Sequence, residues 1–432
     1  MAQSRAEPAL SRSSREWLAG TDQEHRKQYG QYLTPRPVAE ALLDRVRLRP
    51  GMRVLDPGVG TGELLAAVAR RQPEALLTGW DVDAAALSAA GRLVPNATLE
   101  QRSAIEPDDN TSHGHGHKTS AYDLVLANPP YFQIPVTPEL RERFGGVISG
   151  RANIFALFFK VGLDLLVPGG RLAFIVPPSM NSGAYFEALR EHIVARAAIT
   201  DLTVLEGSSL FDGANTAAQL LVLEKHAAPG AERNGSATGF VFEHAQPDAG
   251  FRRVVFTGEP ERLRQGFEGR STLWQLGYEA VTGTVVWNQR RADLRHRPGP
   301  GTVPLVWSRD LRGGEFEPGT SPTPSSGRES KPAYIRSERR LTGPALLVNR
   351  VIGAVGRGEV RTSLVPEGIE FLAENHVNVI RRRTGAAAPA RPRIDWRGLQ
   401  ASIESPGTGD RARLLTGNTQ ISATELTQLL PL

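Results

Sequence analysis

Short apolar runs alternate with helical patterns through the first half of this 432-residue chain. The runs lie at residues 52–56, 76–83, 99–102, 122–127 and 171–177, and segments with helical spacing lie between most of them. Alternating strands and helices are typical of a parallel, doubly wound α/β sheet. In such a sheet, ligands bind beyond the carboxyl ends of the strands. The residues that follow each run are therefore the first place to look for a site.

A glycine-rich loop follows the first apolar run. The segment Asp56-Pro57-Gly58-Val59-Gly60-Thr61-Gly62 leads directly into a helical pattern that begins at Glu63. Strand, glycine loop and helix form the context in which such a loop indicates nucleotide binding, because glycine lets the backbone approach a ligand closely. The second run ends in two acids, and the first of them, Asp81, is a second candidate ligand contact or, alternatively, a helix N-cap.

A rigid corner follows the run at residues 122–127, with the sequence Asn128-Pro129-Pro130-Tyr131. Two prolines cannot continue a central strand, so the chain must turn there. The Asn128 side chain and the Pro129 carbonyl can both accept hydrogen bonds from one planar amino group, while Tyr131 can lie against the ring that carries it. An amine held in this way is a better nucleophile toward an electrophilic methyl group. The alternative is an Asx-type turn capped by prolines.

The composition limits the classes of function. Hydrophobic residues make up 40% and charged residues 22% of the chain, as in ordinary globular proteins. The absence of cysteine excludes disulfides, thiolate zinc sites and cysteine nucleophiles. The first twenty residues show no signal peptide, and no apolar stretch is long enough to span a membrane, so we expect a cytoplasmic protein.

Positive charge is concentrated in the second half. From Ala231 onward there are 28 Lys and Arg residues against 21 Asp and Glu, an excess of 28 − 21 = 7, within a total net charge of +5. Nearly all of the basic residues there are arginines, whose guanidinium groups suit phosphates and guanine edges. This asymmetry suggests a nucleic-acid partner, although a GC-rich genome would also favour arginine.

Changes in composition suggest the domain boundaries. We expect a mobile segment over residues 1–28, an α/β domain over 29–225, a linker over 226–238 and a mixed α/β or mainly β domain over 239–432. Thr34 is placed to cap the helix that follows it.

The tract His113–His117 lies in the loop before the fourth strand. Such tracts can bind a divalent metal, but the polar, glycine-rich surroundings favour an exposed insertion, and we assign it no function.

In the order of these motifs, the chain resembles S-adenosylmethionine-dependent DNA adenine-N6 methyltransferases of the TaqI/PstI type, with gamma-type motif order. The resemblance covers residues 29–225 and continues more loosely into 281–288. It implies a Rossmann-like class I methyltransferase fold followed by a C-terminal DNA target-recognition domain. It also implies S-adenosylmethionine as methyl donor without a metal, double-stranded DNA as substrate, no membrane partner, and a separately encoded endonuclease or other defence partner.

The resemblance further implies which residues bind the cofactor. The methionine part would be held by Thr34, Asp56, Gly58, Gly60 and Gly62. Asp81 would bind the ribose hydroxyls, and the cofactor adenine would lie between Val82 and Phe158. Where the family usually has an aspartate that binds the adenine amino group, this chain has Ser103, a weaker and uncharged acceptor that Asp108 or Asp109 could replace.

For the substrate base, the resemblance implies that Asn128, Pro129, Pro130 and Tyr131 grip the amino group and face of an extruded adenine. Phe211 would stack on this base as a second aromatic. Plain core packing is the alternative for Phe158 and Phe211. The alternatives for the whole protein are an RNA or protein-glutamine methyltransferase with the same chemistry, a catalytically silent DNA-binding subunit, or another nucleotide-binding fold without methyl transfer.

Overall fold

The computed structural model describes residues 9–106, 121–150, 152–205, 218–227, 239–246, 250–319, 331–350, 360–385, 388–389, 392–416 and 420–432. Phe211, the His113–His117 tract, Asp108 and Asp109 lie outside the described residues, as does most of the expected linker. The chain forms two compact units. Unit 1 comprises residues 1–180 and 185–241, and unit 2 comprises residues 181–184 and 242–432.

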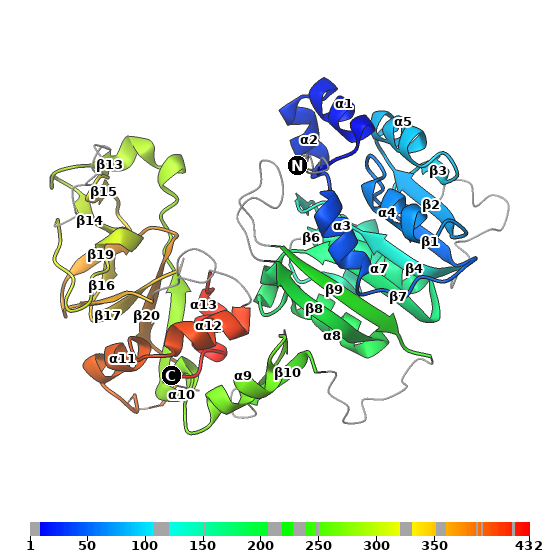
Figure 1. Cartoon of the computed structure of the whole chain (residues 1–432). Helices are drawn as coiled ribbons and strands as arrows, with labels where there is room; N and C mark the ends of the chain where they lie inside the picture. Colours follow the sequence, from blue (N-terminus) through cyan, green and yellow to red (C-terminus); the bar gives the residue numbers. More distant parts are fainter. Residues whose placement is uncertain are drawn as a thin grey trace, which may run out of the picture. The chain divides into compact units, whose positions relative to one another are not determined.

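Unit 1 is built around a seven-stranded sheet with the order β3-β2-β1-β4-β7-β9-β8 (Figure 1). Neighbouring strands from β3 to β7 are parallel, whereas β9 runs antiparallel to both β7 and β8. The strands of this sheet are β1 (Arg53–Asp56), β2 (Leu76–Asp81), β3 (Thr98–Gln101), β4 (Tyr122–Ala127), β7 (Leu166–Val176), β8 (Ala197–Leu205) and β9 (Ala218–Lys225). The remaining elements of unit 1 are α1 (Arg12–Gly20), α2 (Gln23–Tyr29), α3 (Arg36–Leu43), α4 (Glu63–Arg71), α5 (Ala84–Leu93), α6 (Pro138–Phe144), α7 (Ile154–Leu165), α8 (Glu187–Arg196) and the hairpin of β5 (Gln133–Ile134) and β6 (Ala152–Asn153).

The continuous apolar character of β4 is explained by burial on both faces of the sheet. Leu124 and Leu126 belong to a core formed with residues of α3 and α4. On the other face, Gly162 of α7 lies so close to β4 and β7 that a Cβ atom there would be 2.7 Å from Leu172 and 3.4 Å from Val125. The predicted doubly wound, mostly parallel sheet is therefore confirmed.

The strand order reverses between β1 and β4. The chain proceeds from β1 outward through β2 and β3, and then returns to the other side of β1 with β4. The loops after β1 and β4 consequently diverge and leave a crevice at their carboxyl ends. Asp56 ends β1 and Asn128 directly follows β4.

The N-terminal segment differs from the expectation of a mobile tail. Residues 9–33, here called the N-terminal strap, contain α1 and α2, and Figure 1 shows these helices beside α5. Trp17 is buried against Ala86 and Ala89 of α5. Ser14 is buried as well, and its hydroxyl lies 2.7 Å from Oγ1 of Thr61. These contacts join residues about fifty to seventy positions apart, so local polarity did not indicate them.

Unit 2 combines several small sheets with helices, as the predicted mixed α/β or mainly β composition implied. Its sheets have the orders β10-β11, β12-β20-β17-β18 and β13-β15-β14-β19-β16. Its strands are β10 (Val241–Gln246), β11 (Phe251–Phe256), β12 (Tyr278–Thr282), β13 (Leu294–Arg295), β14 (Thr302–Val306), β15 (Tyr334–Arg336), β16 (Leu341–Thr342), β17 (Ala345–Asn349), β18 (Thr362–Val365), β19 (Glu370–Ala373) and β20 (Val377–Arg382). Its helices are α9 (Pro260–Phe267), α10 (Leu273–Leu276), α11 (Trp396–Ile403), α12 (Thr408–Thr416) and α13 (Ala423–Gln428).

Four residues toward the end of the first half, Asn181–Ala184, belong to unit 2. The Asn181 carbonyl accepts a hydrogen bond from the Phe256 amide at 2.9 Å. The Ser182 hydroxyl donates to the buried carboxylate of Glu425 in α13. The chain thus enters unit 2 briefly before it completes the sheet of unit 1.

Candidate active site

A cavity lies at the carboxyl ends of β1, β2 and β4 in unit 1. It is lined by residues of the glycine loop, the end of β2, the segment after β3, the tetrapeptide, α7 and the N-terminal strap: Trp17, Tyr29, Gly30, Gln31, Tyr32, Leu33, Pro57, Gly58, Gly60, Thr61, Asp81, Val82, Ala86, Arg102, Ser103, Ala104, Ile105, Asn128, Pro130, Phe132, Ile154 and Phe158. The structure therefore brings together eight residues that were predicted from the sequence: Gly58, Gly60, Asp81, Val82, Ser103, Phe158, Asn128 and Pro130.

The Asn128 amide has a fixed orientation. Its Nδ2 donates to the Tyr32 carbonyl at 2.9 Å and to Oγ1 of Thr34 at 3.2 Å. Its Oδ1 lies 2.7 Å from the Tyr131 hydroxyl. Since both amide hydrogens are directed at Tyr32 and Thr34, the second lone pair of Oδ1 remains for another donor.

Thr34 was expected to cap a helix, and this expectation is wrong. Pro35 is the N-cap residue of α3 and makes no side-chain capping bond. The Thr34 side chain is buried and accepts from Asn128 instead. A proline at a helix start has no N–H group, so one fewer backbone donor needs a capping side chain. The Thr34 hydroxyl is therefore free to accept from Asn128 of the tetrapeptide.

The Tyr131 hydroxyl points inward, while the residue as a whole is half-buried and is not among those that line the cavity. Its hydroxyl lies 2.7 Å from both Oδ1 of Asn128 and the Ile175 carbonyl, and its ring meets Phe155 edge-on at 6.1 Å. Burial raises the pKa of Tyr131 far above its usual value. The phenol therefore stays protonated and acts as a hydrogen-bond donor, not as a base.

Two carboxylates at adjacent strand ends have raised pKa values. Burial raises the pKa of Asp56 to about 8, although the Gly58 N–H counters it; the nearby charge of Asp81 adds to the increase. Burial also raises the pKa of Asp81, against the hydrogen bonds donated by the backbone of Asp83 and Gly60. Asp56 lies behind the glycine loop, whereas Asp81 faces the cavity.

The residue that caps α5 is Asp83 and not Asp81, because Oδ1 of Asp83 accepts from the Ala85 and Ala86 amides. Oδ2 of Asp83 lies 3.0 Å from Nε2 of His25 and accepts from Nε2 of Gln31 at 2.8 Å. One carboxylate thus joins the strap to the acidic end of β2.

The apolar walls of the cavity are Val82 and Phe158. Val82 is 46% exposed, which is unusual for an apolar side chain at the end of a buried strand, while Phe158 is 6% exposed. A Cβ atom on Gly58 would be 3.2 Å from the Phe158 ring, so the loop and the ring approach each other as closely as glycine allows. Gly62, in contrast, has φ +89° and packs on Ala90, which makes it a structural glycine.

Ser103 lines the cavity as predicted, and its hydroxyl accepts from the Ile105 amide at 3.3 Å. The sequence did not indicate the strap residues Trp17 and Tyr29 to Leu33, nor Phe132. The glycine at position 30 was a feature of the sequence that could have pointed to this part of the cavity. In the structure Gly30 has φ +61°, and a Cβ atom there would be 2.7 Å from the Phe132 ring.

The described residues bring together no group of three or more His, Asp or Glu side chains suited to a metal ion. Among them, no helix has the length and apolar character needed to cross a bilayer.

Comparison with known proteins places this chain near modification enzymes. Residues 87–211 match the Eco57I restriction-modification methylase family. The type II methyltransferase M.BsuBI of Bacillus subtilis is 23% identical over 448 aligned residues, covering 93% of this chain and 87% of M.BsuBI. M.AccI of Acinetobacter calcoaceticus is 23% identical over 216 residues, covering 48% of this chain and 39% of M.AccI, so the chain spans only about two fifths of that relative.

A shorter match has higher identity. The release factor glutamine methyltransferase of Caulobacter vibrioides is 37% identical over 153 residues, covering 33% of this chain and 52% of that enzyme. Among solved structures, the M protein of the type I restriction enzyme EcoKI overlays with a TM-score of 0.36 at 19% identity, covering 45% of this chain and 44% of that one. The matches to the Eco57I methylase family and to M.BsuBI confirm the predicted resemblance of this chain to restriction-modification methyltransferases.

Proposed function

We propose that this protein transfers the methyl group of S-adenosylmethionine to N6 of an adenine that is flipped out of a specific DNA sequence, as part of a restriction-modification or related defence system in the cytoplasm. The observation that carries this proposal is the fixed Asn128 amide at the edge of a cavity whose walls are acidic at Asp81 and apolar at Val82 and Phe158. The cavity suits a nucleoside cofactor, and the Asn128 amide at its edge suits a planar amine placed beside that cofactor.

The cavity suits the cofactor in shape and polarity. The Asp81 carboxylate is available to ribose hydroxyls, and Val82 and Phe158 offer apolar surface to an adenine ring. The close approach of Gly58 to Phe158 leaves a cradle that a Cβ atom would fill. When bound, the cofactor supplies an electrophilic methyl group on a sulfonium, so the protein mainly has to provide position and polarity.

The tetrapeptide would bind the substrate amine. The free lone pair of Asn128 Oδ1, together with the Pro129 carbonyl, would accept the two hydrogens of N6 and stabilise the positive charge that develops as the amine attacks. The base must leave the duplex for this, at a cost of about a few kcal/mol in lost stacking and pairing. Stacking on Tyr131 and Phe211 would offset part of this cost, and residues 239–432 would recognise the target sequence.

Protein-glutamine methylation is the second candidate, because the matches to release factor glutamine methyltransferases reach 37–40% identity over about a third of the chain. The same asparagine could grip a side-chain amide. The rest of the chain argues for DNA, since the match to M.BsuBI extends through both units.

The test compares Asn128→Ala with Asn96→Ala, an exposed asparagine of unit 1 outside the cavity. Loss of the amide should reduce N6-methyladenine formation about 100- to 1000-fold, as measured by mass spectrometry of digested DNA. Cofactor affinity should change by less than about threefold, since the Asn128 contacts are proposed to concern the substrate. Methylation of adenine at the normal rate by Asn128→Ala, or of glutamine alone by the wild type, would overturn the proposal.

A further inference from the structure

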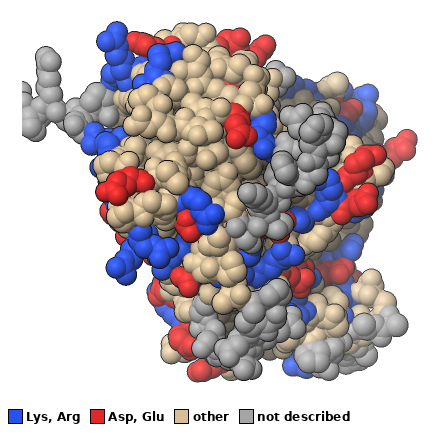
Figure 2. All heavy atoms as spheres, turned by 90° about the vertical axis from the view of Figure 1, so that its right-hand side faces the viewer, with Lys and Arg blue, Asp and Glu red and all other residues tan. Residues whose placement is uncertain are grey.

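Figure 2 faces the side on which Figure 1 draws unit 1, and there Lys and Arg side chains alternate with Asp and Glu around a broad uncharged area. In unit 2, part of the positive charge is neutralised by nearby carboxylates. Many arginines in unit 2 are paired internally, such as Arg262 with Glu259 and Arg381 with Glu279. The side chains that can bind an external anion are the Lys and Arg residues that are not already paired with a carboxylate.

One hollow in unit 2 contains several of these cations. It is lined by Ser308, Arg309, Lys331, Arg361, Glu374 and His376. Lys331 is the single lysine among the 28 basic residues from Ala231 onward. Arg309, Arg361 and Lys331 therefore share this hollow with one carboxylate.

Both oxygens of that carboxylate are bound to a neighbouring residue. Glu374 is 2% exposed, and its Oε1 and Oε2 bind Nδ1 and the backbone amide of His376 at 2.6 and 3.0 Å. The charge of Glu374 still acts on Lys331, but within the described ranges it forms no ion pair with Lys331, Arg309 or Arg361.

Arg309 has unused donors. Its Nε and Nη2 are buried and have no hydrogen-bond partner in the described part of the chain. The nearest carboxylate oxygen, Oδ1 of Asp310, lies 4.0 Å from Nε, and the other oxygen of Asp310 accepts from the Trp307 amide at 2.8 Å. The Arg309 side chain is 26% exposed, and a partly buried guanidinium with two open donors is suited to an anion with more than one oxygen.

An aromatic ring fixes the position of Lys331, which makes no ion pair within the described part of the chain. Its Nζ lies 4.1 Å from the centroid of the Trp307 ring, and the Trp307 indole is fixed by a hydrogen bond to the Pro332 carbonyl at 2.7 Å. Burial lowers the pKa of Lys331 against the opposing charges of Glu374 and Asp310, and an anion in the hollow would further favour its charged form.

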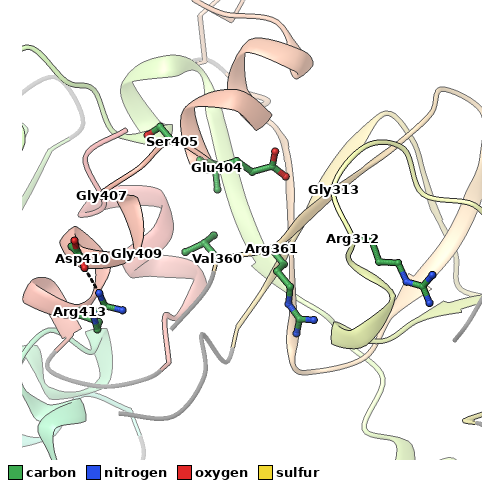
Figure 3. A pocket seen from close by; sticks show the side chains of 11 residues that line it. Arg312, Gly313, Val360, Arg361, Glu404, Ser405, Gly407, Gly409, Asp410 and Arg413 are labelled. Carbon is green, nitrogen blue, oxygen red and sulfur yellow. Dashed lines mark hydrogen bonds and ion pairs between the residues drawn. The ribbon is translucent and has the colours of Figure 1, made fainter. Parts of the chain in front are cut away.

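Arg361 also lines a second hollow, together with Arg312 (Figure 3). In that hollow Arg413 is paired with Asp410, and Glu404 accepts from the Thr362 hydroxyl. The guanidinium groups of Arg312 and Arg361 have no such partner within the described ranges. Figure 3 shows these two side chains extending in the same direction.

We propose that Arg309, Lys331, Arg361 and Arg312, here called the basic groove, bind consecutive phosphodiester groups of duplex DNA. This inference rests on the proposed function and assigns part of DNA binding to named residues. Phosphates protrude from a duplex and fit hollows, whereas base edges lie within grooves and are read by side chains that protrude. The basic groove therefore positions the duplex and contributes no sequence preference of its own.

The test uses the full-length variants Lys331→Gln and Arg361→Gln, singly and together, with Arg262→Gln as a control for the loss of one positive charge in unit 2. Each single change should weaken binding about tenfold, equally for duplexes with and without the target sequence. The slope of log affinity against log salt should decrease in magnitude by about 0.9 for each variant and by about 1.8 for the pair. Arg262→Gln should leave both quantities unchanged.

Unchanged affinity and slope in the double variant would overturn the inference, as would a loss confined to the target duplex, because that result would indicate base reading. Cofactor affinity should be normal in every variant. If the wild type binds duplex DNA with this salt dependence but methylates no adenine, the proposed function fails alone; if it methylates adenine and the double variant binds normally, only the basic groove fails.

Discussion

Gly58 lies so close to Phe158 that even one methyl group would crowd the ring. A Cβ atom at this position would be 3.2 Å from Cε1 of Phe158, closer than ordinary van der Waals contact. The Gly58→Ala variant should therefore push the ring into the cavity and weaken S-adenosylmethionine binding roughly tenfold, about 1.4 kcal/mol. Calorimetric titration measures this directly.

Gly91→Ala is the matched control for that change. Gly91 lies within α5, where a Cβ atom would be 3.6 Å from Leu99, an ordinary contact. Alanine should stabilise this helix by about 0.5–1 kcal/mol without affecting the cofactor. Equal cofactor affinity in both variants would contradict the role given to Gly58.

The Asp56 carboxyl makes stability depend on pH. Its pKa is raised from 3.8 to about 8, so over that interval the folded protein retains a proton that the unfolded chain has released. The resulting stabilisation is fully present below the unfolded pKa and is lost as the pH rises through the folded pKa. The free energy of unfolding should consequently fall between about pH 4 and pH 8.

Asp56→Asn should reduce this decline, because asparagine resembles the protonated acid and can still accept from the Gly58 amide. Relative to the wild type, the variant should gain at least about 1 kcal/mol between pH 5 and pH 8, measured by thermal unfolding. Parallel pH profiles for the two proteins would show that Asp56 is ionised in the folded state.

Residue spacing predicted the cavity better than it predicted the partners of each side chain. Asp81, Val82 and Asn128 converge because parallel strands place their carboxyl ends at one edge, and Phe158 reaches the same cavity from α7. The contact of Asn128 with Thr34 joins residues 94 positions apart, and no local pattern contains it. The role of Phe211 stays a prediction.

At the scale of elements, the N-terminal strap depends on a few distant contacts. Asp83 joins it to α5 through His25 and Gln31, and Gln31 itself lines the cavity. Burial alone would raise the pKa of Asp83, but the bonds from Gln31, His25 and the α5 backbone outweigh it and lower the pKa. This link is therefore present at neutral pH and is lost only as the pH falls through that lowered pKa.

His25→Ala removes one bond of this link without removing a residue that lines the cavity. We expect faster amide hydrogen exchange in α1 and α2 and a several-fold faster release of S-adenosylmethionine. Stopped-flow dissociation and exchange mass spectrometry measure the two effects. Normal exchange combined with fast release would show that His25 affects the cofactor by some route other than the strap.

The strap was missed because its sequence is polar and its helices are short. In α1 only Ser14 and Trp17 are buried, so the helix carries little apolar periodicity. The sheet strands were predicted well because burial on both faces requires continuous apolar runs. The boundaries in unit 2 were less predictable, since short strands such as β13 and β16 have two residues each and owe their existence to pairing with distant partners.

At the scale of the whole molecule, unit 2 includes the segment Asn181–Ala184, which is far in sequence from residues 242–432. The stability of unit 2 therefore depends on Ser182 in that segment. The Ser182 hydroxyl donates to Glu425, whose carboxylate is 4% exposed and also receives the Ser422 amide of the α13 capping box. Ser182→Ala should lower the stability of unit 2 by about 1–3 kcal/mol, the cost of an unsatisfied buried acceptor. Scanning calorimetry detects this as a shift of one transition.

Ser179→Ala is the control for that change, because Ser179 is exposed and precedes the segment that belongs to unit 2. A shift of the same size in both variants would mean that the effect arises in unit 1.

The same segment limits how new specificities can be made by exchanging parts between related enzymes. A single crossover in the linker would transfer residues 242–432 but would leave residues 181–184 of the old sequence behind. In such a hybrid, the residues equivalent to Glu425 and Phe256 would come from one enzyme, whereas their partners at positions 182 and 181 would come from the other. Functional hybrids should therefore need two separated exchanges, so natural recombination at the linker alone would rarely produce a stable enzyme.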